Sequence, residues 1–74
     1  MIYWTASNNS TFLNGCRPAK NLLAAVRAGR AYLRGELCGE GTISYYDDPD
    51  CYKPIRQDSK TIFTGHKWQV TTNI

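Results

Sequence analysis

Two carboxylates and a lysine in the C-terminal half have the spacing of a metal-dependent nuclease motif. Pro49-Asp50, seven further residues and then Asp58-Ser59-Lys60 fit a loose pattern. In that pattern two acids hold a metal ion and a lysine stands near the attacking water. The pattern is short, so unrelated sequences often contain it by chance. In addition, Asp50 falls in a predicted turn, and the chain is too short for the core of such an enzyme. We therefore rank a nuclease third among the candidate functions.

The other polar residues that could do chemistry have simpler interpretations. The acidic tip at residues 47–50 lacks the glycine and the distal glutamate of an EF-hand loop, so we expect a solvated turn there. His66 has no serine or cysteine nucleophile near it in sequence, so we cannot argue for a catalytic triad around it. We predict a protein that is not an enzyme, with no catalytic residue, no metal and no cofactor.

A row of basic residues is the main candidate for a binding site. Lys20, Arg27 and Arg34 recur every seven residues, which places them within about 40° of one another on a helix. Arg30 lies nearby, on the border of the apolar face. Such a ridge of cations would attract phosphates or acidic side chains. The alternative is the ordinary polar back of an amphipathic helix, but that back usually carries both signs of charge, and this one carries no acid.

Aromatic residues form a second candidate set. Neighbours in a strand point to opposite faces of a sheet, so either Tyr45 or Tyr46 should lie on an uncovered face. Rings beside basic side chains stack on bases or anchor a protein interface. The alternative is packing in the core, which we expect for Trp4 and Phe63. The predicted binding residues are therefore Lys20, Arg27, Arg30, Arg34, Tyr45 and Tyr46.

One helix and several short strands would position these residues. A helix is expected over residues 18–34, with Pro18 as its first residue and Gly35 just beyond its end. Gly29 inside it indicates either a close approach to a sheet or an early end. Pro54 restricts its strand to an edge or a bulge. Strands are expected at residues 2–6, 42–46, 51–56, 60–64 and 68–72, with turns at 47–50, 57–59 and 65–67.

These elements predict a single α+β domain over residues 1–74. The expected order is β-α-β-β-β-β, with one helix packed on one face of an antiparallel sheet of four or five strands. The other face of the sheet should be partly open, because no second helix is available to cover it. An edge strand near Pro54 leaves a homodimer as an alternative to a monomer.

The composition of the chain indicates the compartment in which the protein acts and the kind of partner that it binds. No apolar run approaches the length of a membrane span, and the first residues lack the features of a signal peptide, so we expect a cytoplasmic protein. Residues 1–35 hold five basic residues and no acid, whereas residues 36–74 hold four basic residues and all six acids. This asymmetry indicates an anionic or acidic partner, although a solvated surface paired across the fold explains it equally well.

The cysteines add an expectation about redox state. Three cysteines with no CxxC spacing and no export signal predict free, reduced, mostly buried thiols. The chain contains the four residues that a Cys₃His zinc site needs, in Cys16, Cys38, Cys51 and His66. Their scattered spacing argues against such a site.

The layout resembles that of very small phage and prophage accessory proteins, including several anti-CRISPR proteins. The similar features are an initial strand, an alanine-rich helix (residues 19–31), a glycine-rich exit, a strand with an acidic turn (residues 42–50), and a closing Gly65-His66-Lys67-Trp68 element. The resemblance is one of architecture, and it implies a host-defence antagonist that binds its target stoichiometrically. Our leading expectation is therefore a phage-encoded, non-enzymatic inhibitor that binds a host protein or ribonucleoprotein complex of the CRISPR type. A small DNA- or RNA-binding regulator is the alternative.

Overall fold

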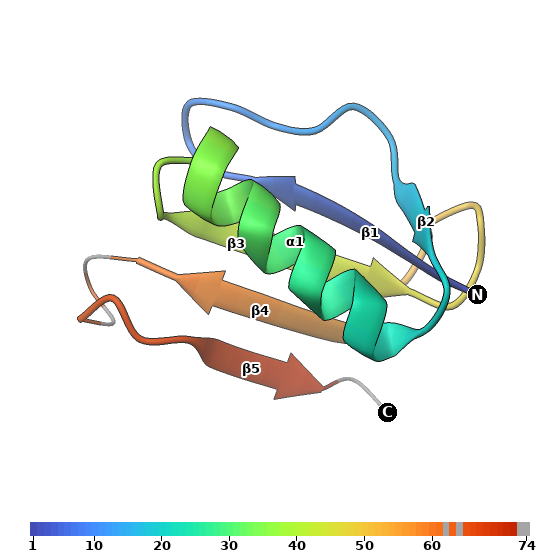
Figure 1. Ribbon diagram of the computed structural model, residues 1–74. Helices are drawn as coiled ribbons and strands as arrows, with labels where there is room; N and C mark the ends of the chain where they lie inside the picture. The colour runs from blue at the N-terminus through green and yellow to red at the C-terminus, as the bar shows by residue number, and fades with distance from the viewer. Residues whose placement is uncertain (62, 64, 73–74) are drawn as a thin grey trace.

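The computed structural model, described for residues 1–61, 63 and 65–72, has one helix against an antiparallel sheet. Along this part of the chain the elements are β1 (Ile2–Ser7), β2 (Arg17–Ala19), α1 (Leu22–Glu36), β3 (Gly41–Tyr46), β4 (Arg56–Lys60) and β5 (Gln69–Thr72). The strands lie in the order β2-β1-β3-β4-β5. Figure 1 shows α1 lying across β1 and β3, with β4 and β5 extending beyond it. The predicted α+β class is confirmed, although the helix follows the second strand and not the first.

The helix begins later than the sequence predicts, because Pro18 belongs to β2. There it lies opposite Tyr3 of β1. Asn21 is the N-cap instead: its side chain accepts a 2.9 Å hydrogen bond from the amide of Ala24, which satisfies one of the free amides of the first turn. The helix also runs through Gly35, the predicted terminator, and Cys38 takes the left-handed conformation beyond its end.

The observed strand boundaries differ most from the predicted ones around β4. The predicted turn at residues 57–59 is the centre of β4, where Asp58 lies opposite Ile43 of β3. The predicted strand at 51–56 is mostly loop, and that at 60–64 retains only Lys60, with residues 62 and 64 outside the described part. Polar residues indicated a turn here, but pairing with β3 and β5 on both sides overrides that local preference.

The core lies between α1 and the strands β1 and β3. Trp4 and Ile43 are buried there, as the pattern predicts for Trp4, while Phe63 is 96% exposed and is not a core residue. Gly29 is the point of closest approach: a Cβ at this position would lie 2.7 Å from Cγ2 of Ile43. The prediction that this glycine marks a close helix–sheet contact is therefore confirmed.

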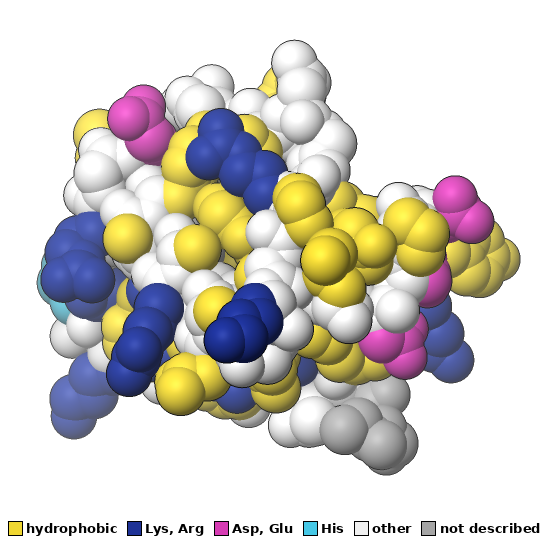
Figure 2. Space-filling view, turned by 45° about the vertical axis from the view of Figure 1, so that its right-hand side comes forward, with side chains coloured by type: hydrophobic (Ala, Val, Ile, Leu, Met, Phe, Trp, Pro, Cys, Tyr) yellow, Lys and Arg dark blue, Asp and Glu magenta, His cyan; other side chains and the backbone are white. Residues whose placement is uncertain are grey.

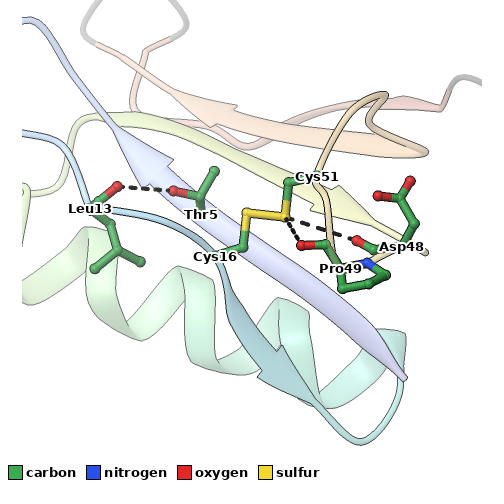
Figure 3. The surroundings of a disulfide bond; sticks show 6 residues. All are labelled: Thr5, Leu13, Cys16, Asp48, Pro49 and Cys51. Carbon is green, nitrogen blue, oxygen red and sulfur yellow. Dashed lines mark hydrogen bonds between the residues drawn. A yellow bond between two sulfur atoms is a disulfide. The ribbon is translucent and has the colours of Figure 1, made fainter.

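Two of the three cysteines form a disulfide, contrary to the expectation of three free thiols. Cys16, just before β2, is bonded to Cys51 in the loop between β3 and β4 (Figure 3). The bond spans β1, which lies between β2 and β3 in the sheet. The two cysteines are 35 positions apart, so only the fold brings them together. Cys38 is free and exposed, not buried. Within the described residues, α1 is neither long nor apolar enough to cross a lipid bilayer.

Candidate functional site: a basic ledge beside α1

The centre of the site is a buried carboxylate with basic partners. Asp58 of β4 has 0% exposure and lies on the helix side of the sheet. Its Oδ2 accepts a 3.1 Å hydrogen bond from Nε of Arg30, and its Oδ1 accepts a 2.8 Å bond from Nε of Arg56. Nη2 of Arg30 also lies 3.1 Å from Oδ2. A buried charge is tolerated only when it is paired and hydrogen-bonded in this way.

Tyr45 completes the surroundings of this carboxylate. Its hydroxyl donates a 3.0 Å hydrogen bond to Oδ2 of Asp58. Burial raises the pKa of Tyr45 well above its ordinary value, and the neighbouring Asp58 charge and the hydrogen bond raise it further. The hydroxyl therefore keeps its proton and remains a donor at any physiological pH. The guanidinium of Arg56 lies 5.6 Å from the centre of the Tyr45 ring.

Trp68, just before β5, extends the cluster towards the sheet edge. The Arg30 guanidinium lies 4.4 Å from the centre of its indole ring, and the Lys60 ammonium lies 5.5 Å from the same ring. Cations at these distances are attracted by the negative face of an aromatic ring. One tryptophan thus holds two basic side chains, one from the helix and one from β4.

Two further arginines lie beside Arg30 on the helix surface. Arg27 and Arg34 are three positions before and four positions after it, and residues at these spacings are neighbours on a helix. Both are exposed, and neither is in a salt bridge within the described residues. We call the surface formed by Arg27, Arg30, Arg34, Arg56 and Lys60 the basic ledge.

Charge is unevenly spread over the molecule. Figure 2 shows that most of the visible Lys and Arg side chains lie on the left half of that view, whereas most of the Asp and Glu side chains gather at the right. Asp47 and Asp50, in the loop after β3, belong to the acidic part of the sequence and are exposed. Inside the ledge the carboxylate of Asp58 pairs with two basic groups, Arg30 of α1 and Arg56 of β4.

The structure corrects several of the predicted binding residues. Lys20 is exposed but precedes the N-cap, so it is not part of a helical row with Arg27. Arg30 is held by Asp58 and Trp68 and is only partly exposed. Tyr45 has 0% exposure and cannot anchor a partner.

Tyr46 is half-buried and points to the face opposite α1, since its neighbour Tyr45 points into the core. The ledge therefore keeps Arg27 and Arg34 as its freely exposed members and does not include Tyr46.

The nuclease motif does not assemble into a metal site. The Asp58 carboxylate is occupied by two arginines and Tyr45, and Asp50 is in the exposed loop after β3. Among the described residues no group of three or more His, Cys, Asp or Glu side chains is placed to hold a metal ion.

Sequence reasoning missed three members of the site: Arg56, Lys60 and Trp68. The available signal was the alternation of Arg56, Asp58 and Lys60, because residues two apart share one face of a strand. From sequence alone, a strand with charged residues on one face is easily taken for a solvated turn. It can be recognised as buried only when the residue that pairs with its charges is known. That partner is Arg30, which is 28 positions from Asp58.

Comparison of this chain with family models, with curated proteins and with solved structures finds no match.

Proposed function

We propose that the protein is a non-enzymatic inhibitor that docks its basic ledge on an acidic surface of a host defence complex, of the CRISPR type, and blocks that complex's contact with nucleic acid. The observation that carries the proposal is the ledge itself. Arg27 and Arg34 are exposed next to an arginine whose position is fixed by a buried carboxylate. A fixed neighbour reduces the conformational entropy lost when a partner is bound.

The aromatic rings that lie beside basic side chains favour a protein partner over direct reading of bases. On the helix side, Trp68 is covered by Arg30 and Lys60. Trp4 and Tyr32 are both covered by Arg17, whose guanidinium lies 5.8 Å and 5.3 Å from the two ring centres. Stacking of bases needs open ring faces, and these rings already have cationic partners.

Binding to the phosphate backbone of DNA or RNA is the second candidate. The specific observation in its favour is that basic side chains from two elements, α1 and β4, lie along one side of the molecule. Contacts of this kind position a protein on nucleic acid without reading its sequence.

The proposed place of action is the cytosol of an infected cell. Thiols are kept reduced there, so the Cys16–Cys51 bond would open. The basic ledge is built on α1, β4 and Trp68, none of which carries either cysteine. Binding through the ledge should therefore be the same with and without a reductant.

Charge reversal of the two exposed arginines tests the proposal. The Arg27→Glu/Arg34→Glu variant should lose capture of the defence complex from host extract, as measured by affinity isolation and mass spectrometry. The matched control is Lys20→Glu/Lys53→Glu, which changes the net charge equally at exposed residues outside the ledge. Equal losses in both variants, or retained capture in the first, would refute the ledge as the docking surface.

A mobility-shift assay separates the two candidates. The purified protein is mixed with a short DNA duplex and with single-stranded RNA at about 50 and 200 mM salt, a range over which five phosphate contacts, one for each residue of the ledge, would lose about 10²- to 10³-fold in affinity. A shift that weakens in this way and is lost in Arg27→Glu/Arg34→Glu would favour the second candidate. Absence of any shift together with ledge-dependent capture would favour the first.

A further inference from the structure

A pocket of about 350 Å³ lies at the end of the sheet remote from the N-terminus. It forms where β1 ends, β3 begins and the chain leaves β4, at the left of Figure 1. Its lining includes Ser7 and Thr42, which lie opposite each other in the pairing of β1 with β3. A volume of this size is at the lower end of the range for small-molecule sites.

One asparagine builds the wall of this pocket. The Asn8 Oδ1 accepts two 2.8 Å hydrogen bonds, from the amides of Ser10 and Thr11. Its Nδ2 donates to the carbonyls of Leu37, at 3.2 Å, and Glu40, at 3.0 Å. The side chain thus ties the loop after β1 to the segment between α1 and β3, and the pocket is formed before any ligand arrives.

A close backbone contact beside Asn8 fixes the same wall of the pocket. Gly41 has a φ of +155°, and a Cβ there would lie 2.6 Å from the carbonyl oxygen of Ser7. Only glycine lets the start of β3 come so near to the end of β1.

Apart from Glu40, the lining is uncharged and rich in hydroxyl groups. Ser7, Ser10, Thr42 and Thr61 each carry a hydroxyl, which both donates and accepts hydrogen bonds. Among the described residues the lining contains no lysine or arginine that would favour an anion. Glu40 adds an acceptor.

An exposed ring stands at the rim. Phe63 lines the pocket and is 96% exposed, so its face is open to a ligand. A flat apolar ring next to hydroxyl groups suits a molecule that has both a hydrogen-bonding edge and an apolar C–H face.

The sheet surface that adjoins the pocket has the same character. Ala6 and Ile43 are buried under α1, so the alternate residues Ser7 and Thr42 point the other way. All positions of β1, β3, β4 and β5 that share this orientation hold serine, threonine, glutamine or tyrosine. A ligand longer than the pocket would therefore continue over uncharged polar residues.

We propose that this pocket binds a neutral carbohydrate of one or two sugar units. The sugar hydroxyls would bond to the serine and threonine side chains and to Glu40, and Phe63 would stack on one face of a sugar ring. Hydrolysis of a glycosidic bond ordinarily uses two carboxyl groups, and Glu40 is the one carboxylate that the described residues contribute to the lining, so we expect the pocket to bind the sugar without cleaving it. The site is separate from the basic ledge and does not depend on the proposed function.

Amide chemical-shift mapping with ¹⁵N-labelled protein tests the proposal. The probes are N-acetylglucosamine, glucose and maltose, with glucose 6-phosphate as an anionic comparison. We expect saturable shifts at Ser7, Thr42 and Thr61 for at least one neutral sugar, with a dissociation constant on the order of 1 mM. Absence of saturable shifts for all three neutral sugars, or tighter binding of the phosphate, would overturn the proposal.

Two phenylalanines provide a matched pair of variants. Phe63→Ala should weaken sugar binding by about fivefold to tenfold, the effect expected for loss of one aromatic contact. Phe12→Ala removes another exposed ring that is not in the lining, and it should bind as the wild type does. Both rings are exposed, so both variants should fold. Equal affinities of the two variants would also contradict the proposal.

Discussion

The hydroxyl of Tyr45 and Nε of Arg30 donate to the same oxygen of Asp58, at 3.0 Å and 3.1 Å. One donor comes from the neighbouring strand and the other from the helix, so this carboxylate links the two layers of the fold. Arg56 binds the other carboxylate oxygen from within β4 itself. The ion pairs fix Arg30 within the basic ledge and also close the core on that side.

Removal of the Asp58 charge should therefore destabilise the protein strongly. Asp58→Asn keeps the shape of the side chain but leaves Arg30 and Arg56 without their counter-charge, and we expect a loss of about 3 kcal/mol in the free energy of unfolding. Urea denaturation measures this value. Asp47→Asn, at an exposed position, should change it by no more than about 0.5 kcal/mol. A similar small change for Asp58→Asn would show that the buried ion pairs contribute little.

The raised pKa of Tyr45 predicts a loss of stability in alkali. Above about pH 10 an unfolded tyrosine releases its proton while the folded one keeps it, so the unfolded state binds fewer protons and stability falls as pH rises. The difference in unfolding free energy between the wild type and Tyr45→Phe should be constant below that pH. Above it, the difference should shrink by up to about 1.4 kcal/mol per pH unit. The Tyr52→Phe variant, which lacks an exposed hydroxyl, is the control, and identical pH curves for the two variants would contradict the assignment.

The class of fold could be predicted because its core follows local patterns. Trp4 of β1 and Leu33 of α1 fall at the spacings of a strand and a helix, and both are buried as these spacings indicate, although Leu23 of the same predicted helix face is 59% exposed. The start of the helix could not be placed, because Pro18 is equally suited to a first helical residue and to a short edge strand. Its partner Tyr3 in β1 decides between the two.

The basic ledge could be predicted only in part, for a different reason. Arg27 and Arg34 follow the period of the helix and are visible in the sequence. The burial of Asp58 depends on its contact with Arg30, which is 28 positions away, and a strand of charged and polar residues has no apolar pattern to reveal this burial. The pairing of Cys16 with Cys51 also joins residues that are far apart in the chain, so no local sequence pattern reveals it.

The contact between Gly29 and Ile43 predicts opposite effects at two glycines of one helix. Gly29→Ala gains about 1 kcal/mol of helix propensity but forces a methyl group against a buried, branched side chain, at a typical cost of about 1–3 kcal/mol. We expect a net loss of stability. In Gly35→Ala the added methyl group meets no atom of the described residues within 4 Å beyond the helix's own backbone and the two chain neighbours, and it should stabilise the protein by about 1 kcal/mol. Thermal unfolding of both variants checks the prediction, which is wrong if Gly29→Ala raises the melting temperature.

The Cys16–Cys51 bond predicts a dependence of stability on redox conditions. It closes a loop with a sequence separation of 35, and restriction of the unfolded chain by such a loop is worth about 3–4 kcal/mol. Cys16→Ser/Cys51→Ser should lose about that amount in urea denaturation, and a thiol reductant should lower the wild type to the level of the variant. The reductant should not affect the double variant.

Cys38→Ser is the control for this prediction, because Cys38 is exposed and unbonded, and we expect a change within about 0.5 kcal/mol. Thiol counting gives an independent measurement. The non-reduced wild type in denaturant should show one reactive thiol, from Cys38, and three after reduction. Three reactive thiols before reduction would mean that the loop after β3 is held in place by packing alone, and the double serine variant should then be as stable as the wild type.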